Sequence, residues 1–170
     1  MMPIITIAKE KGINVDKIVE LVAQKLEMPV VDKFLVDEIR EHNGLTSFNS
    51  KKSGEFQTQY DVFTKTNFYN GMILGSGQSD LDHIRHLIVM DEVKKGPCIV
   101  VGKCARDIMA EEGIPALDIF VYSNNESLNE KEKNNSGKYD LALNIGAFGS
   151  ELCADLIEAA AKKMAEKIAA

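Results

Sequence analysis

The sequence predicts an α/β protein built on a three-layer, doubly wound, parallel five-stranded sheet with a helical insert. Two observations support this fold class. Five short runs of apolar and often β-branched residues are spread over the 170 residues, and helical patterns separate most of them. Such runs are typical of strands buried on both faces of a sheet. Right-handed crossovers between parallel strands then place helices on both sides of the sheet.

The first expected strand is the run IITIA at residues 4–8. A helix of about residues 14–27 follows, and Asn14 is its expected N-cap because its side chain can accept a hydrogen bond from a free helical N–H. The residues that recur at helical spacing and predict the buried face are Ile18, Leu21, Val22 and Leu26. A second strand is expected at residues 28–31, followed by Asp32 and a helix of about residues 34–42.

Residues of about 45–95 predict a helical insert, with one helix at roughly 55–74 and a clearer one at 79–95. We expect the insert to belong to one domain that spans residues 1–170, because no linker divides the chain. His83 and His86 lie three residues apart within it. That spacing is more typical here of a solvated helix face than of a metal site, so no metal is predicted.

The remaining strands are expected at residues 98–101, 117–122 and 141–145, with a helix at 103–112 after the first of them. A last helix is expected at about 150–169. An apolar residue at every fourth position predicts its core face, along Leu152, Leu156, Ala160, Met164 and Ile168.

Composition narrows the possible functions. The formal net charge of −6 argues against a general nucleic-acid-binding surface, which carries a basic excess. The three cysteines have no metal-ligand spacing and are expected to be free thiols in a reducing compartment. The first residues lack the pattern of a signal peptide, and no apolar run approaches the roughly 20 residues of a membrane span. We therefore expect a cytoplasmic protein with neither a membrane nor a nucleic-acid partner.

The loop after the first strand, in the stretch AKEKGINVDKI, is where a phosphate-binding loop of the form G-x-x-x-x-G-K-[ST] would lie. Only Gly12 remains of that pattern. Lys9, Lys11 and Lys17 supply positive charge, and the start of the following helix supplies its dipole. On spacing alone, this stretch is weak evidence for a phosphate site, and a capped helix start with solvated lysines is the favoured interpretation.

Three blocks of sequence resemble the cytidylate-kinase-like branch of the P-loop kinases. They are ITIAKEKG with the following KIVELVAQKLEMPVVDKFLVDEI, then GPCIVVGKCARDIM, and then KYDLALNIGAFGSE. The resemblance implies a P-loop-kinase-like fold and ATP-dependent transfer of a phosphoryl group to a nucleoside monophosphate such as CMP. ATP and Mg²⁺ would be the cofactors, and the expected partner is a small nucleotide or phosphate.

Residue by residue, the resemblance is incomplete at the phosphate end. Gly12 matches the first glycine of the family loop, but Ile13, Asn14 and Val15 occupy the following Ser-Gly-Gly. Relative to other cytidylate kinases, Val15 stands where the loop lysine would be, and Lys17 stands where the magnesium-binding hydroxyl would be. The residues that the resemblance assigns to the cofactor are Lys9, Gly12, Asn14 and Lys17.

The acceptor side is also altered. The resemblance assigns Asp32, Lys103 and Arg106 to substrate binding, and Lys103 replaces an arginine of the family, which loses a bidentate donor. The family lid is shortened here to about residues 124–138, and no arginine follows Arg106. Phosphoryl transfer depends on positioning and charge stabilisation, so this chain lacks most of the catalytic apparatus.

Three hypotheses follow. The first is a degenerate family member that binds a nucleotide or phosphate with weak or lost kinase activity. The second is an active kinase with an unusual loop, since the family often lacks the loop lysine. The third is a non-catalytic interaction protein, with a homodimer formed through the aromatic middle segment.

Overall fold

The computed structural model describes residues 1–31, 78–102, 105–123 and 136–170. The chain divides into two compact units, Met1–Val31 with Glu92–Ala170, and Asp32–Asp91. Whether both belong to one domain stays a prediction. The helices expected at 34–42 and 55–74 lie outside the described residues, whereas the next one is present as α5 (Gln78–Val93).

The first unit contains a five-stranded, all-parallel sheet, as the sequence predicts. Its strands are β1 (Ile4–Lys9), β2 (Val30–Val31), β3 (Ile99–Val101), β4 (Ala116–Tyr122) and β5 (Leu141–Asn144). Their spatial order is β2-β3-β1-β4-β5. β1 therefore lies at the centre, with Ile5 opposite Ile99 on one side and opposite Leu117 on the other.

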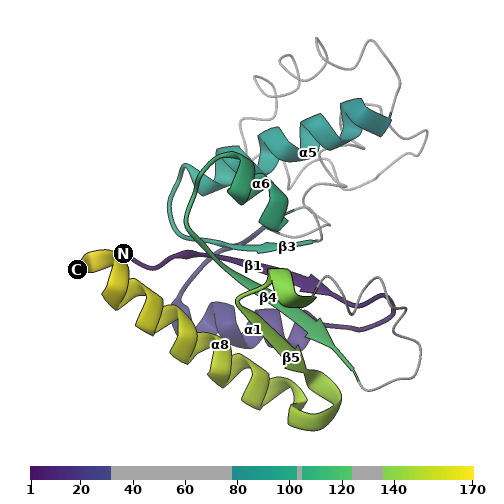
Figure 1. Cartoon of the computed structure of the whole chain (residues 1–170), viewed down its shortest axis with the longest axis vertical. Helices are drawn as coiled ribbons and strands as arrows, with labels where there is room; N and C mark the ends of the chain where they lie inside the picture. The colour runs from purple at the N-terminus through teal and green to yellow at the C-terminus, as the bar shows by residue number, and fades with distance from the viewer. Residues whose placement is uncertain (32–77, 103–104, 124–135) are drawn as a thin grey trace, which may run out of the picture. The chain divides into compact units, whose positions relative to one another are not determined.

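Helices cover both faces of the sheet (Figure 1). α1 (Asp16–Leu26) and α8 (Ile145–Ala169) lie on one face, and α6 (Ala105–Glu111) lies on the other. The main core forms between the sheet and the α1–α8 layer, where Ile5, Ile7 and Ile119 are fully buried. This is the three-layer, doubly wound arrangement that was expected.

The expected buried face of α1 is correct at Ile18 and Val22. Leu21 and Leu26 are only partly buried, and Val19 is buried instead. At the end of this helix, Lys25 pairs with two residues of α8, Asp155 at 2.9 Å and Glu158 at 3.4 Å. Hydrogen bonding to Asp155 raises the pKa of Lys25, and hydrogen bonding to Lys162 lowers the pKa of Glu158.

The expected core face of α8 is wrong at three of its five positions. Leu152 and Leu156 are 45% and 37% exposed, and Ile168 is also exposed. Ala160 and Met164 are partly buried. The fully buried residues of the helix are Cys153, Ala154, Ile157 and Ala161.

α8 also begins earlier than residue 150. Asn144 is its N-cap and accepts a hydrogen bond from the N–H of Ala147 at 3.3 Å. The helix is kinked at Gly149, whose φ of 74° lies in the left-handed region that glycine adopts without strain. In the described part of the chain, no helix has the length and apolar character needed to cross a membrane.

Candidate functional site

The candidate site lies at the carboxyl edge of the sheet, where ligands bind in open parallel α/β folds. The chain leaves β1 toward α1 on one face and leaves β3 toward α6 on the other. The point between β1 and β3 where the connections diverge is the expected ligand position in such a sheet. The described residues at this edge are the loop between β1 and α1, Gly102 after β3, and Ser123 after β4.

The loop after β1 opens with a tight turn. The N–H of Ile13 donates to the carbonyl of Glu10 at 3.3 Å, and Gly12 has a φ of 89°. A positive φ at the third residue of such a turn favours glycine. The ammonium of Lys9 donates to the carbonyl of Ile13 at 2.5 Å, across the turn. The backbone here is folded into a turn, and its N–H groups do not form the open row that surrounds a phosphate in a phosphate-binding loop.

The side chains that stand in the place of the family glycines contribute to the core. Val15 is only 2% exposed and belongs to the main core, and Ile13 packs against that core while partly buried. To turn its backbone N–H groups toward a phosphate, the loop would have to move these two side chains out of their contacts with the core.

The start of α1 already has internal partners. Val15 is its N-cap in place of the expected Asn14, and the helix begins at Asp16. The Asn14 side chain nevertheless accepts the N–H of Asp16 at 2.8 Å. The Asp16 carboxylate in the first turn complements the positive end of the helix dipole, which lowers the attraction for an external anion.

Glu10 is a residue of this loop that sequence reasoning missed. Its exposed fraction is 4%, so it is one of two buried polar residues in the described part of the chain. Its N–H donates to the carbonyl of Val121 at 2.9 Å, and its Oε2 accepts the N–H of Ser123 at 3.1 Å. Glu10 thereby joins the ends of β1 and β4 at the carboxyl edge of the sheet.

Arg106, in the first turn of α6, lies over the opposite face of the sheet from α1. Its Nε donates to the carbonyl of Lys138 at 2.9 Å and lies 3.8 Å from Asp118 Oδ2. Its Nη1 donates to Asp107 Oδ1 at 3.1 Å, and the guanidinium stands 5.6 Å from the centre of the Tyr139 ring. The guanidinium of Arg106 is thus already held by its own unit.

Asp118 completes this cluster. It accepts a hydrogen bond from the Thr6 hydroxyl at 2.5 Å. Its N–H donates to Asp140 Oδ2 at 2.8 Å, and its carbonyl accepts the N–H of Asp140 at the same distance. Burial raises the pKa of Asp118, against the opposing effects of Thr6 and Arg106. Burial also raises the pKa of Tyr139.

The residues predicted for the cofactor fall into two groups. Lys9, Gly12 and Asn14 lie in the one loop, as described. Lys17 points to solvent with a side chain that is 60% exposed, and its ammonium is 3.7 Å from Glu20. Asp32 and Lys103 lie outside the described residues. The binding roles assigned to these residues and to Arg106 stay predictions.

Other kinds of chemistry have little support in the described residues. Within those ranges, no group of three His, Cys, Asp or Glu side chains could hold a metal ion. His83, the residue paired with His86 in the sequence pattern, lies among the side chains that are not described. Cys98 and Cys153 are free and buried, and burial raises the pKa of Cys98 to about 11, which makes it an unreactive thiol.

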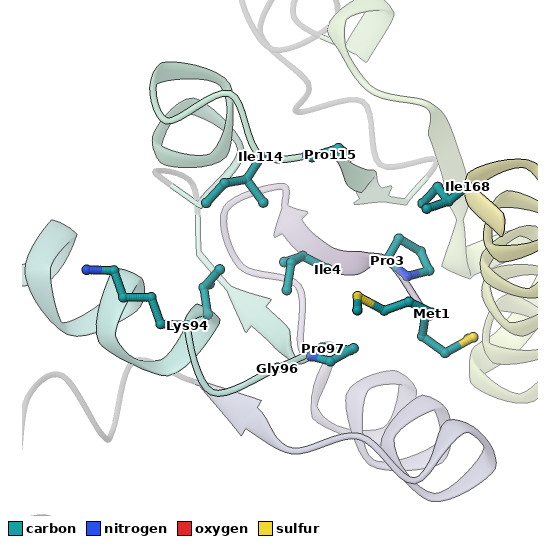
Figure 2. A pocket seen from close by; sticks show the side chains of 11 residues that line it. Met1, Pro3, Ile4, Lys94, Gly96, Pro97, Ile114, Pro115 and Ile168 are labelled. Carbon is teal, nitrogen blue, oxygen red and sulfur yellow. The ribbon is translucent and has the colours of Figure 1, made fainter.

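A cavity of about 340 Å³ lies at the amino edge of the sheet, in the first unit (Figure 2). Its lining includes Ile4, Pro97, Ile114, Pro115 and Ile168. Lys94 is its one charged side chain, and the nitrogen of Lys94 points away from the other labelled residues. Nucleotide sites need several polar groups that orient the ligand, and this lining offers only Lys94, whose nitrogen points away.

Comparison with known proteins agrees with this geometry. A solved structure titled as an uncharacterized protein from Eubacterium ventriosum ATCC 27560 superposes with a TM-score of 0.58 at 17% sequence identity. The match covers 96% of this chain and 99% of that chain, and at this identity it supports the fold alone. No curated protein matches the sequence.

The family comparison covers almost the whole chain. The model of the cytidylate kinase-like family matches residues 4–167, which include the β1 loop, all five strands and most of α8. With a parallel sheet of this order, and with the β1 loop at its carboxyl edge, the chain belongs to the cytidylate kinase-like family.

Proposed function

We propose that this protein is a non-catalytic member of its family that binds a small phosphate-bearing nucleotide, weakly, at the carboxyl edge of the sheet. The observation that carries the proposal is the packing of Val15. A side chain that replaces a loop glycine is part of the main core, so the loop contributes to folding where a kinase would use it to hold phosphate.

Charge supports the same proposal. The described loop and first helical turns contain Lys9, Lys11 and Lys17, and against them stand Glu10, Asp16 and Glu20. Three charges of each sign give no net attraction for a triphosphate. The Lys9 ammonium is engaged with the carbonyl of Ile13, and no hydroxyl stands at Lys17 to bind magnesium. A single arginine finger changes phosphoryl-transfer rates by roughly 10³–10⁵-fold, and this chain has no arginine after Arg106.

A coupled assay of ADP release tests the catalytic part. With millimolar ATP, Mg²⁺ and each nucleoside monophosphate, we expect turnover no higher than in a blank. Lys17→Ala is the diagnostic variant. Lys163→Ala is its matched control, because Lys163 also forms an exposed i,i+3 pair with a glutamate on a helix. Turnover that is lost in Lys17→Ala and retained in Lys163→Ala would establish an active kinase with an unusual loop.

Thermal unfolding tests the binding part. A ligand at ten times its Kd stabilises the folded state by about 1.4 kcal/mol, which raises the melting temperature by several degrees. We expect such a rise with CMP or ATP at millimolar concentration. No shift with any nucleotide would refute nucleotide binding.

Cytoplasmic location and self-association belong to the same proposal. The free, buried thiols of Cys98 and Cys153 suit a reducing compartment. The aromatic segment expected to form a homodimer lies outside the described residues, so light scattering is the test of that part. A strict monomer would leave nucleotide binding as the function of the isolated chain.

A further inference from the structure

Glu10 has one carboxylate oxygen that its own chain does not use. Oε2 accepts the N–H of Ser123, but among the described residues no group lies within hydrogen-bond distance of Oε1. The residue is 4% exposed, so water has little access to that oxygen. A buried polar atom without a partner costs free energy and calls for a reason.

The position of Glu10 suggests the reason. Its backbone N–H continues the β1–β4 ladder by one residue, and its side chain holds the first residue after β4. Both residues follow neighbouring parallel strands at the carboxyl edge of the sheet, on the side of β1 away from β3. In open α/β sheets ligands are received beyond the carboxyl ends of the strands.

We propose that Glu10 Oε1 accepts a hydrogen bond from the ligand, and that the donor belongs to the ribose or the base of a nucleotide. The inference rests on the proposed function and adds which part of the ligand meets the carboxyl ends of β1 and β4. Phosphate oxygens are acceptors and carry negative charge, so they cannot pair with a carboxylate. Ribose hydroxyls and exocyclic amines are donors, and a hydrogen bond to a carboxylate is stronger than one between neutral groups.

Glu10→Gln tests this at the level of one atom. The glutamine side-chain oxygen can still accept from Ser123, which keeps β1 and β4 joined, while its NH₂ group replaces Oε1 and turns an acceptor into a donor. Glu151→Gln is the matched control, because it makes the same change of charge at an exposed residue of α8. Calorimetric titration with cytidine, CMP and inorganic phosphate supplies the readout.

We expect wild type and Glu151→Gln to bind cytidine and CMP alike, and Glu10→Gln to bind both at least about tenfold more weakly. Phosphate affinity should be unchanged or higher in Glu10→Gln. Equal affinity of Glu10→Gln and wild type for cytidine and CMP, within twofold, would overturn the role of Glu10 and leave the proposed function standing. Failure of wild type to bind any nucleoside or nucleotide would overturn both.

A series of ligands on the wild-type protein gives the same answer without a variant, should Glu10→Gln fold poorly. Uridine lacks the exocyclic amine of cytidine, and 2′,3′-dideoxycytidine lacks the 2′- and 3′-hydroxyls. We expect one of the two to bind about tenfold more weakly than cytidine, which identifies the donor. If all three bind within twofold of one another, Glu10 Oε1 does not recognise a donor of the ligand and the inference is wrong.

Discussion

Asp118 belongs to β4, and its carboxylate lies 3.8 Å from Arg106 of α6, on the face of the sheet that α6 covers. Its ionisation depends on burial and on the groups around it. The Thr6 hydroxyl and the Arg106 guanidinium favour the charged form, whereas burial and the nearby Asp140 favour the neutral one. Burial is the largest effect, so the pKa of Asp118 is raised above its ordinary value of 3.8. Folding is therefore favoured by protonation at this residue.

The sign of the pH dependence follows from that shift. A raised pKa means that the folded chain binds the proton more tightly, so stability is lost as the pH rises through the pKa of the folded state. Asp118→Asn keeps an oxygen for Thr6 and removes the charge. We expect the variant to be at least as stable as wild type at pH 7, and the difference to vanish as the pH falls below 3.8.

Urea unfolding of Asp118→Asn at several pH values measures this difference. Asp107→Asn is the control, because it removes a carboxylate that also pairs with Arg106 but has a largely exposed side chain. A variant that is less stable at pH 7 and recovers in acid would mean that the attraction of Arg106 for Asp118 exceeds the cost of burial.

At the scale of elements, α8 shows which features of a helix can be predicted from the sequence and which cannot. Its existence and its last residue follow from apolar periodicity, but its first residue and its buried face do not. Two stripes at every fourth position run along this helix, one from Leu152 and one from Cys153, and a displacement of one residue turns the stripe by roughly 100° around the axis. The stripe that begins at Leu152 starts on the solvent side, and the core takes Cys153, Ile157 and Ala161, one position later.

Adjacent substitutions in α8 distinguish the two faces. Ile157→Ala removes a fully buried side chain and should lower the free energy of unfolding by about 2–4 kcal/mol. Leu156→Ala removes a partly exposed side chain and should cost less than about 1 kcal/mol. Denaturant titration measures both. A larger cost at Leu156 than at Ile157 would restore the stripe expected from the sequence.

The candidate site was partly predictable for a similar reason. The position of the loop after β1, and the glycine of its turn, follow from the strand pattern and the family motif. The role of Glu10 does not, because a glutamate between two lysines in a polar loop is usually solvated. Only the pairing of β1 with β4 brings Ser123, 113 positions away in the sequence, to the carboxylate of Glu10.

For the whole molecule, the loop and the core are not independent. Val15 belongs both to the place of a lost phosphate loop and to the main hydrophobic cluster. A change that reopens the loop must therefore weaken the fold. Position 15 can hold either the glycine of the family's catalytic loop or the apolar side chain that stabilises this chain, but not both.

Val15→Gly, which restores a family glycine, tests that competition. We expect a loss of about 2–4 kcal/mol from the emptied core position and the added backbone freedom, with no gain in ATP turnover. Ile13→Ser, the family residue at a position only partly buried, should cost less. Unfolding in urea and the ADP-release assay measure both variants. ATP turnover in Val15→Gly would mean that the side chain of Val15 alone prevents catalysis by this loop.

The central position of β1 in the sheet also affects how the chain folds during its synthesis. Thr6 meets Asp118, 112 positions later, so β1 leaves the ribosome long before both of its neighbours, β3 and β4, have been synthesised. Pairings this distant in sequence form slowly, and an unpaired apolar strand is prone to aggregate. The nascent chain should therefore depend on chaperones until residue 122 has emerged, and fragments that stop before β4 should be insoluble.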